Sequence, residues 1–182
     1  MVDSMYIAHI HVQNYRCFRD IKVEFQEGIN VIIGESNSGK TALLRALGLI
    51  FDRRHRKRPD IYDFHQGTNH FDQPPTIAVS VTLRSSSKDT LADKALVASW
   101  LTKLDTPWEA VLTYRFVLPE ENVEEFRKEL PPVDRDAFLR KVERYLPKYV
   151  SNIYGGKPEA FLKADLESLS KFDFQFNWLR VL

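Results

Sequence analysis

Apolar and polar residues alternate along several stretches of this 182-residue chain, a pattern typical of β-strands with one buried face. The alternating stretches are Met5–Val12 (in part), Ile21–Phe25, Thr76–Leu83 and Trp108–Leu118. A short strand is also expected over Ser151–Tyr154. The stretch Ile29–Ile33 is apolar at both parities, which predicts a strand buried on both faces.

Elsewhere apolar residues recur every three to four positions, which predicts helices. The expected helices are Ala42–Phe51, Asp89–Leu104, Glu120–Leu130, Asp134–Val150 and Pro158–Leu169. Strands and helices together predict an α/β fold. We expect a mixed sheet, with N-terminal antiparallel strands around one strand–loop–helix unit, and helical additions. Residues 1–182 are expected to form part of one domain, with an insertion over residues 84–150.

The loop between the expected strand and helix reads Gly-Glu-Ser-Asn-Ser-Gly-Lys-Thr over residues 34–41, here called the phosphate loop. Its spacing, G-x-x-x-x-G-K-[ST], is that of loops that bind nucleotide phosphates. Gly34 and Gly39 let the backbone turn tightly and approach the phosphates closely. Backbone N–H groups and the start of the following helix then provide an anion site.

Side chains of the phosphate loop add specific roles. Lys40 can reach the β- and γ-phosphates and is the expected catalytic residue, and the Thr41 hydroxyl can bind Mg²⁺. The alternative is a Gly/Ser turn that leads into a helix, with Lys40 in solvent. The residues expected to bind nucleotide are Gly34, Ser36, Asn37, Ser38, Gly39, Lys40, Thr41 and Ala42.

Composition limits the partners that overall charge can attract. The net charge is +1, so only a local basic patch could bind a polyanion. The single cysteine, Cys17, excludes an internal disulfide and suits a reducing compartment. We expect its side chain to be a small buried apolar group rather than a reactive thiol. No signal sequence or long apolar run is visible, so we expect a cytoplasmic protein without a membrane partner.

One local basic patch follows the first expected helix. It consists of Arg53, Arg54, Arg56, Lys57 and Arg58. These residues are candidate contacts to DNA phosphates. The alternative is a solvated loop whose cations interact favourably with the helix C-terminus.

Two parts of a nucleotide-hydrolysing site are missing from the pattern. Hydrolysis requires an acidic residue at the end of a second apolar strand to hold Mg²⁺ and orient water. We find no such strand after Thr41, and no Leu-Ser-Gly-Gly signature. We therefore expect a fragment, or a protein that binds nucleotide without turnover.

A separate group of histidine and aspartate residues has no spacing typical of a metal site. Its members are Asp63, His65, His70 and Asp72.

The N-terminal residues resemble a known family. Asn14-Tyr15-Arg16-Cys17-Phe18, then Gly28–Gly34 and Asn37–Thr41, resemble the start of the RecF/SMC branch of ABC-type ATPases. Weaker pointers, Asp63-Phe64-His65 and Asn177-Trp178-Leu179-Arg180, resemble the OLD (overcoming lysogenization defect) ATP-dependent nucleases. The loop departs from the common family form, because Glu35 replaces proline and Ser38 replaces glycine or alanine.

The resemblance implies roles for individual residues. Arg16 would approach the phosphates or the adenine of ATP, and Asn37 would line the phosphate site. A glutamine from a later loop would complete the Mg²⁺ shell, with Gln175 and Gln66 as candidates. The chain would be the first lobe of an ABC-type ATPase head, which pairs with a second head around ATP.

The resemblance also implies a function for the whole protein. It would be an ATPase that acts on DNA, regulating an OLD-like endonuclease whose Toprim nuclease domain would follow. The alternative is a RecF/SMC-type repair ATPase in which nucleotide controls dimerisation, and a small P-loop kinase is a further alternative. We expect the chain alone to bind ATP weakly and to hydrolyse it poorly.

Overall fold

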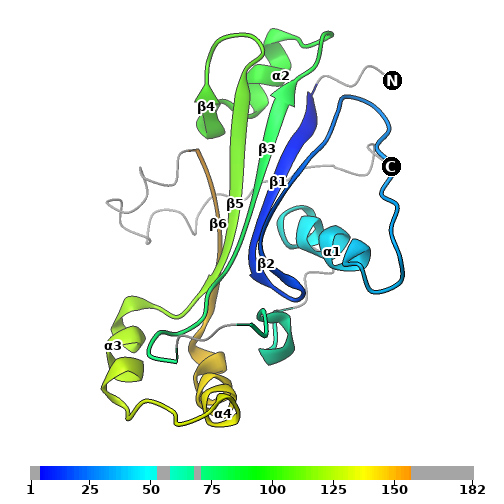
Figure 1. The fold of residues 1–182 in the computed structure, drawn as a ribbon. Coiled ribbons are helices and arrows are strands. Elements are labelled where there is room, and N and C mark those ends of the chain that lie inside the picture. The colour runs from blue at the N-terminus through cyan, green and yellow to red at the C-terminus, as the bar shows by residue number, and fades with distance from the viewer. Residues whose placement is uncertain (1–4, 53–57, 68–70, 157–182) are drawn as a thin grey trace.

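The computed structural model describes residues 5–52, 58–67 and 71–156. Its strands form one sheet in the order β2–β1–β3–β5–β4, and β6 also pairs with β5; every pair is antiparallel. The long strands β3 and β5 run through the middle of the sheet (Figure 1). The strand bounds are β1 Met5–Tyr15, β2 Phe18–Glu24, β3 Ile77–Ser85, β4 Leu101–Lys103, β5 Glu109–Val117 and β6 Val150–Gly155.

The helices lie around this sheet. α1 packs on one face, α2 and β4 lie at one end, and α3 and α4 lie at the other end (Figure 1). Their bounds are α1 Lys40–Phe51, α2 Leu91–Leu96, α3 Glu120–Lys128 and α4 Arg135–Tyr145, with short 3₁₀ turns η1 Ile61–Asp63, η2 Ala98–Trp100 and η3 Leu146–Lys148. The predicted α/β class and the N-terminal antiparallel strands are therefore confirmed.

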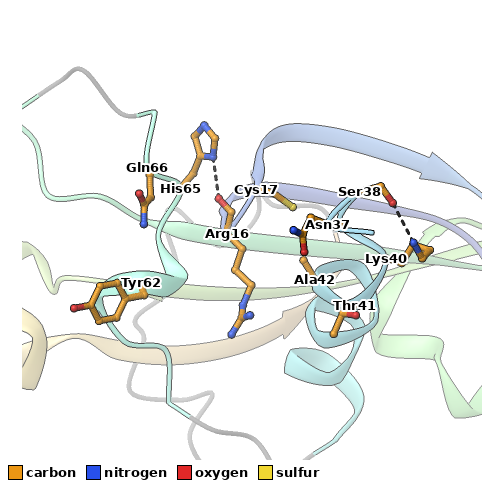
Figure 2. Close-up of a pocket in the computed structure, with 11 residues that line it drawn as sticks. Arg16, Cys17, Asn37, Ser38, Lys40, Thr41, Ala42, Tyr62, His65 and Gln66 are labelled. Atoms are coloured by element: carbon orange, nitrogen blue, oxygen red, sulfur yellow. Dashed lines mark hydrogen bonds between the residues drawn. The ribbon is translucent and has the colours of Figure 1, made fainter. Parts of the chain in front are cut away.

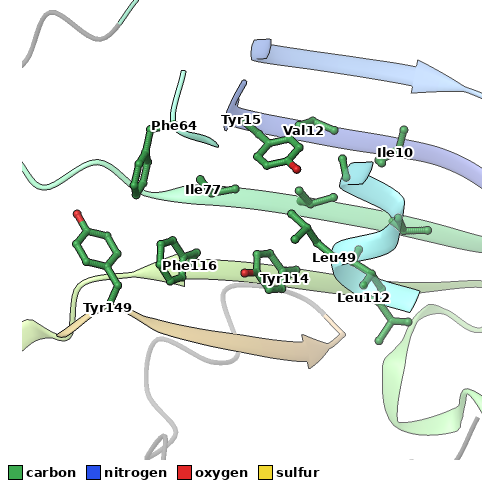
Figure 3. Packing of buried hydrophobic residues seen from close by; sticks show 14 of the residues in the cluster. Ile10, Val12, Tyr15, Leu49, Phe64, Ile77, Leu112, Tyr114, Phe116 and Tyr149 are labelled. Carbon is green, nitrogen blue, oxygen red and sulfur yellow. The ribbon is translucent and has the colours of Figure 1, made fainter. Parts of the chain in front are cut away.

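The alternating pattern sorts side chains onto the two faces of the sheet. One face is apolar and packs against Leu43, Ala46 and Leu49 of α1 (Figure 3). Its buried members from the strands are Ile10, Val12, Ile77, Val79, Val81, Leu83, Ala110, Leu112, Tyr114 and Phe116. Burial of each valine, leucine, isoleucine or phenylalanine side chain stabilises the fold by about 1.5–3 kcal/mol. This apolar layer therefore fixes α1 on the sheet.

The opposite face of the sheet is polar, and its side chains are joined across strands. His9 Nε2 lies 2.9 Å from Thr82 Oγ1. On the neighbouring strands, Ser80 Oγ lies 2.9 Å from Thr113 Oγ1. Among the residues that the structure describes, no helix is long and apolar enough to cross a membrane.

The predicted strand Ile29–Ile33 is wrong. The segment is irregular and runs outside the sheet (Figure 1), with Ile29 96% and Ile33 89% exposed. A strand buried on both faces needs a hydrogen-bonded neighbour on each side, and no strand of the described residues pairs with this segment. Instead the Asn30 side chain bonds to Gln26 N and O and to Gly28 O, which holds a local turn.

Two predicted helices are shorter than their apolar spacing indicated. Asp89–Leu104 contains only α2, η2 and β4, because Leu101 and Lys103 pair with β5 and Trp100 is buried against the core. In the second, α4 ends at Tyr145, and Pro147 lies in η3, before β6 begins at Val150. Residues 84–150 were predicted to form an insertion, and strand β5 from this range lies inside the sheet. The predicted domain boundaries stay a prediction.

A substitution at Gly155 tests the packing of β6 against Trp100. A methyl group added at Gly155 would lie 1.8 Å from Trp100 Cδ1. We expect Gly155→Ala to lower the free energy of unfolding by about 1–3 kcal/mol, the cost of overpacking a filled site. Urea denaturation measures the change. Gly48→Ala is the control, since that position has nothing within 4 Å. It should gain about 0.5–1 kcal/mol from helix propensity, and equal effects of both substitutions would contradict this packing.

Candidate nucleotide-binding site

The phosphate loop ends where α1 begins, and its backbone leaves the helix start open. Asn37 and Gly39 have positive φ angles of 65° and 94°, which carry the chain sharply into Lys40. Gly39 is the N-cap of α1, and no side-chain cap bonds to the helix start. The first N–H groups of a helix need acceptors, and together with the helix dipole they favour an anion.

Glycine is required at Gly39 for two reasons. The left-handed φ angle disfavours any residue with a Cβ. In addition, an added methyl group would lie 2.8 Å from Phe18 Cζ and 3.0 Å from Cys17 Sγ. The phosphate loop therefore rests directly against the tip of the β1–β2 hairpin.

Lys40 turns its ammonium group back into the phosphate loop. Its Nζ donates to Gly34 O and Glu35 O, each at 2.6 Å, and lies 3.4 Å from Ser38 Oγ. These contacts direct the positive charge toward the backbone of the loop. Glu35 contributes its backbone carbonyl here, and its carboxylate makes none of these contacts.

The turn at residues 14–18, here called the Arg16 turn, faces the phosphate loop. Its backbone is left-handed at Asn14 and Arg16, with φ angles of 54° and 52°. Arg16 Nη2 lies 2.7 Å from Asp63 Oδ1, and the Arg16 guanidinium lies 5.5 Å from the centroid of the Tyr15 ring. Burial alone would lower the pKa of Arg16, but Tyr15 and Asp63 outweigh it and raise that pKa.

The segment 60–65 holds the Arg16 turn through its backbone. Arg16 N donates to Asp63 O at 2.8 Å, and Tyr15 and Phe64 form an isolated β-bridge. His65 adds an Nδ1 contact to Arg16 O at 3.0 Å. The segment is itself ordered by a capping box, in which the Asp60 side chain accepts a backbone N–H of η1 and the Asp63 side chain accepts the backbone N–H of Asp60.

The phosphate loop, the Arg16 turn and the η1 segment line an open pocket of about 580 Å³ (Figure 2). The predicted residues that line it are Arg16, Asn37, Ser38, Gly39, Lys40, Thr41 and Ala42, together with the candidate Gln66. Gly34 and Ser36 belong to the same loop but do not line the pocket. Gln175 lies outside the described residues. The fold therefore places Arg16 beside the phosphate loop, two segments that the sequence analysis assigned to one site.

Three further pocket residues were not predicted. Cys17, Tyr62 and His65 line the wall on the hairpin and η1 sides. Cys17 was interpreted as a small buried residue, whereas it is exposed. Its position beside Arg16 was a signal that could have placed it here. Tyr62 and His65 could not be placed from the sequence, because only the fold brings η1 next to the Arg16 turn.

The candidate DNA contact at Arg58 is not supported by its geometry. Arg58 Nη2 donates to three backbone carbonyls, of Leu146, Pro147 and Tyr149, at 2.7–3.0 Å. The side chain therefore ties the start of segment 58–67 to η3 and Tyr149, just before β6. Arg53, Arg54, Arg56 and Lys57 lie outside the described residues. No group of acidic, cysteine or histidine side chains in the described residues could hold a metal ion by itself.

Comparison with known families finds one match that covers most of the chain. The sequence pattern of the family described as "AAA ATPase domain" matches residues 5–175. Two relatives, each described as DNA replication and repair protein RecF, match a shorter part. The protein from Bacillus cytotoxicus is 39% identical and that from Pediococcus pentosaceus 42% identical, each over 57 residues, or 31% of this chain. The chain spans 15% of the length of each relative.

Two solved structures are similar over part of this chain. A RecF structure with ATP matches with 24% identity and a TM-score of 0.39, over 62% of this chain and 24% of RecF. A structure described under ATP-driven dimerisation and DNA-stimulated activation of SMC ATPases matches with 13% identity and a TM-score of 0.40, over 75% of this chain and 99% of its own. With TM-scores this low, the two structures support no inference about the site.

A matched glycine pair tests the contact between the loop and the hairpin. Gly39 and Gly28 have φ angles of 94° and 95°, but only Gly39 has close neighbours. Both alanine variants should lose about 1 kcal/mol to the left-handed backbone. Gly39→Ala should lose roughly 1 kcal/mol more from its clash with Phe18. Urea denaturation measures both losses. Equal losses would show that the loop does not pack against the hairpin.

Proposed function

The chain belongs to the AAA ATPase domain family, and on this premise we propose that it binds ATP and Mg²⁺ in the pocket between the phosphate loop and the Arg16 turn. One observation carries the proposal. A cationic pocket lies at the uncapped N-terminus of α1, and the loop that leads into this helix has the spacing of a phosphate-binding loop. Its lining includes the cationic side chains of Arg16 and Lys40 and, among the described residues, no aspartate or glutamate, so the pocket favours an anion.

The residues present fit a nucleotide with its metal ion. The open N–H groups at the start of α1 and the Lys40 ammonium would bind phosphate oxygens. The hydroxyl oxygen of the exposed Thr41 would coordinate Mg²⁺, which offsets phosphate charge when bound. Arg16 would bind a phosphate from the opposite wall, because its planar fork matches phosphate oxygens.

We propose that this part of the chain binds ATP but hydrolyses it poorly alone. Hydrolysis needs a group that orients or deprotonates the attacking water. The described residues that line the pocket include no aspartate or glutamate, and the nearby carboxylate of Asp63 is paired with Arg16. The remaining catalytic groups would come from another part of the full-length protein or from a second ATPase head.

At the level of the whole protein, we propose an ATPase that acts on DNA, as the regulatory ATPase of an OLD-like endonuclease. The short motifs around Asp63 and Asn177 support that reading. The alternative is a RecF/SMC-type repair ATPase in which nucleotide controls pairing of two heads. The relatives described as RecF, at 39–42% identity over 57 residues, favour this alternative. A P-loop kinase is the weakest of the three.

Removal of the Lys40 ammonium tests nucleotide binding. Lys40→Ala should weaken ATP·Mg²⁺ binding at least about tenfold, since one charge-assisted bond to phosphate contributes roughly 1.5–3 kcal/mol. Isothermal titration calorimetry measures the affinity. Lys22→Ala is the control, because Lys22 is exposed on β2 and does not line the pocket. If Lys40→Ala keeps the wild-type affinity, the proposed site is wrong.

A salt titration tests the DNA proposal. We expect binding of the chain to duplex DNA to weaken as salt rises, with a slope of about −0.9 for each phosphate neutralised. Replacement of Arg53, Arg54, Arg56 and Lys57 by glutamine should flatten that slope. Lys103→Gln, at an exposed position of β4, should leave it unchanged. Fluorescence anisotropy at several salt concentrations measures the salt dependence of DNA affinity for each variant. If the variant with all four substitutions keeps the wild-type slope, these four residues do not contact DNA phosphates.

A further inference from the structure

Asp63 is a buried carboxylate on the far side of the pocket wall. It is 7% exposed, and it is the only acidic residue that is buried among those the structure describes. A buried carboxylate is costly unless its charge is paired and its oxygens accept hydrogen bonds. Asp63 meets both conditions, because Oδ1 lies 2.7 Å from Arg16 Nη2 and Oδ2 accepts Asp60 N at 3.0 Å.

Arg16 is correspondingly restrained at both its backbone and its side chain. Its N–H donates to Asp63 O and its carbonyl contacts His65 Nδ1. Its guanidinium lies over the Tyr15 ring and is paired with Asp63, while the side chain keeps 34% exposure along the pocket. Nε is buried, and no described residue accepts its hydrogen.

We propose that Asp63 is a positioning residue, which holds the Arg16 guanidinium in the pocket wall where it can receive a phosphate of the nucleotide. The assignment rests on the proposed function. A free arginine must give up much of its rotamer freedom to bind a phosphate. Asp63 and Tyr15 impose that loss when the protein folds. The Asp63 contact occupies one edge of the guanidinium, and an arginine presents five donors in total.

Two other roles for Asp63 predict different behaviour. If Asp63 only completes the capping box of η1, its effect on ATP would equal that of a change at Asp60, which accepts Tyr62 N at 2.9 Å. If Asp63 instead withholds Arg16 from the nucleotide, its removal would strengthen binding. A positioning role requires that its removal weakens binding and that the effect passes through Arg16.

A double-mutant cycle on the full 182-residue chain separates these roles. ATP·Mg²⁺ affinity is measured by calorimetry for the wild type, Asp63→Asn, Arg16→Ala and the double variant, with thermal unfolding of each. We expect Asp63→Asn to weaken binding about tenfold and to have no further effect once Arg16 is alanine. Asp60→Asn is the control and should bind normally, since asparagine also caps helices well.

The outcomes distinguish this assignment from the proposed function. If the wild type binds no ATP, the proposed function fails and the positioning role fails with it. If the wild type binds but Asp63→Asn binds as well or better, only the positioning role is overturned. An equal loss in the Arg16→Ala background also overturns it. Should Asp63→Asn not fold, Asp63→Glu keeps the charge but displaces it, and a wild-type affinity for that variant would overturn the proposal.

Discussion

The junction between Arg16 and Asp63 is the interaction on which the pocket depends. It joins the tip of the β1–β2 hairpin to the η1 segment through an ion pair and two backbone hydrogen bonds, and these two bonds form the isolated bridge between Tyr15 and Phe64. One of these backbone bonds runs from Arg16 N to Asp63 O and the other from His65 N to Asn14 O. Because the hairpin tip also contacts Gly39, the same turn positions both walls of the pocket.

Packed elements support this junction on both sides. β1 is an inner strand, paired with β2 on one side and β3 on the other, and its buried residues pack against α1. At the other side of the junction, Phe64 packs on Phe116 and Tyr149, with ring centroids 5.9 and 5.7 Å away. Aromatic contacts of this kind resist displacement. The proposed nucleotide site therefore lies against packed elements, although the phosphate loop itself is irregular.

Much of this arrangement was predictable from the sequence, because its signals are local. Alternation gave β3 and β5, and the phosphate loop with the following helix came from spacing alone. The Arg16 turn was assigned through resemblance. The Asp63 partner was not predictable, since the contact joins residues far apart in the sequence. The apolar run at residues 29–33 misled for a related reason, because a strand depends on neighbours that the run itself does not specify.

The central claim is that ATP binds between the phosphate loop and the Arg16 turn. Hydrogen–deuterium exchange with and without ATP·Mg²⁺ tests it most directly, since it reports which backbone amides a ligand protects. The account predicts slower exchange in peptides that cover residues 14–18, 36–42 and 61–66, with β5 unchanged. ATP-dependent protection confined to other segments, with these three unaffected, would contradict it.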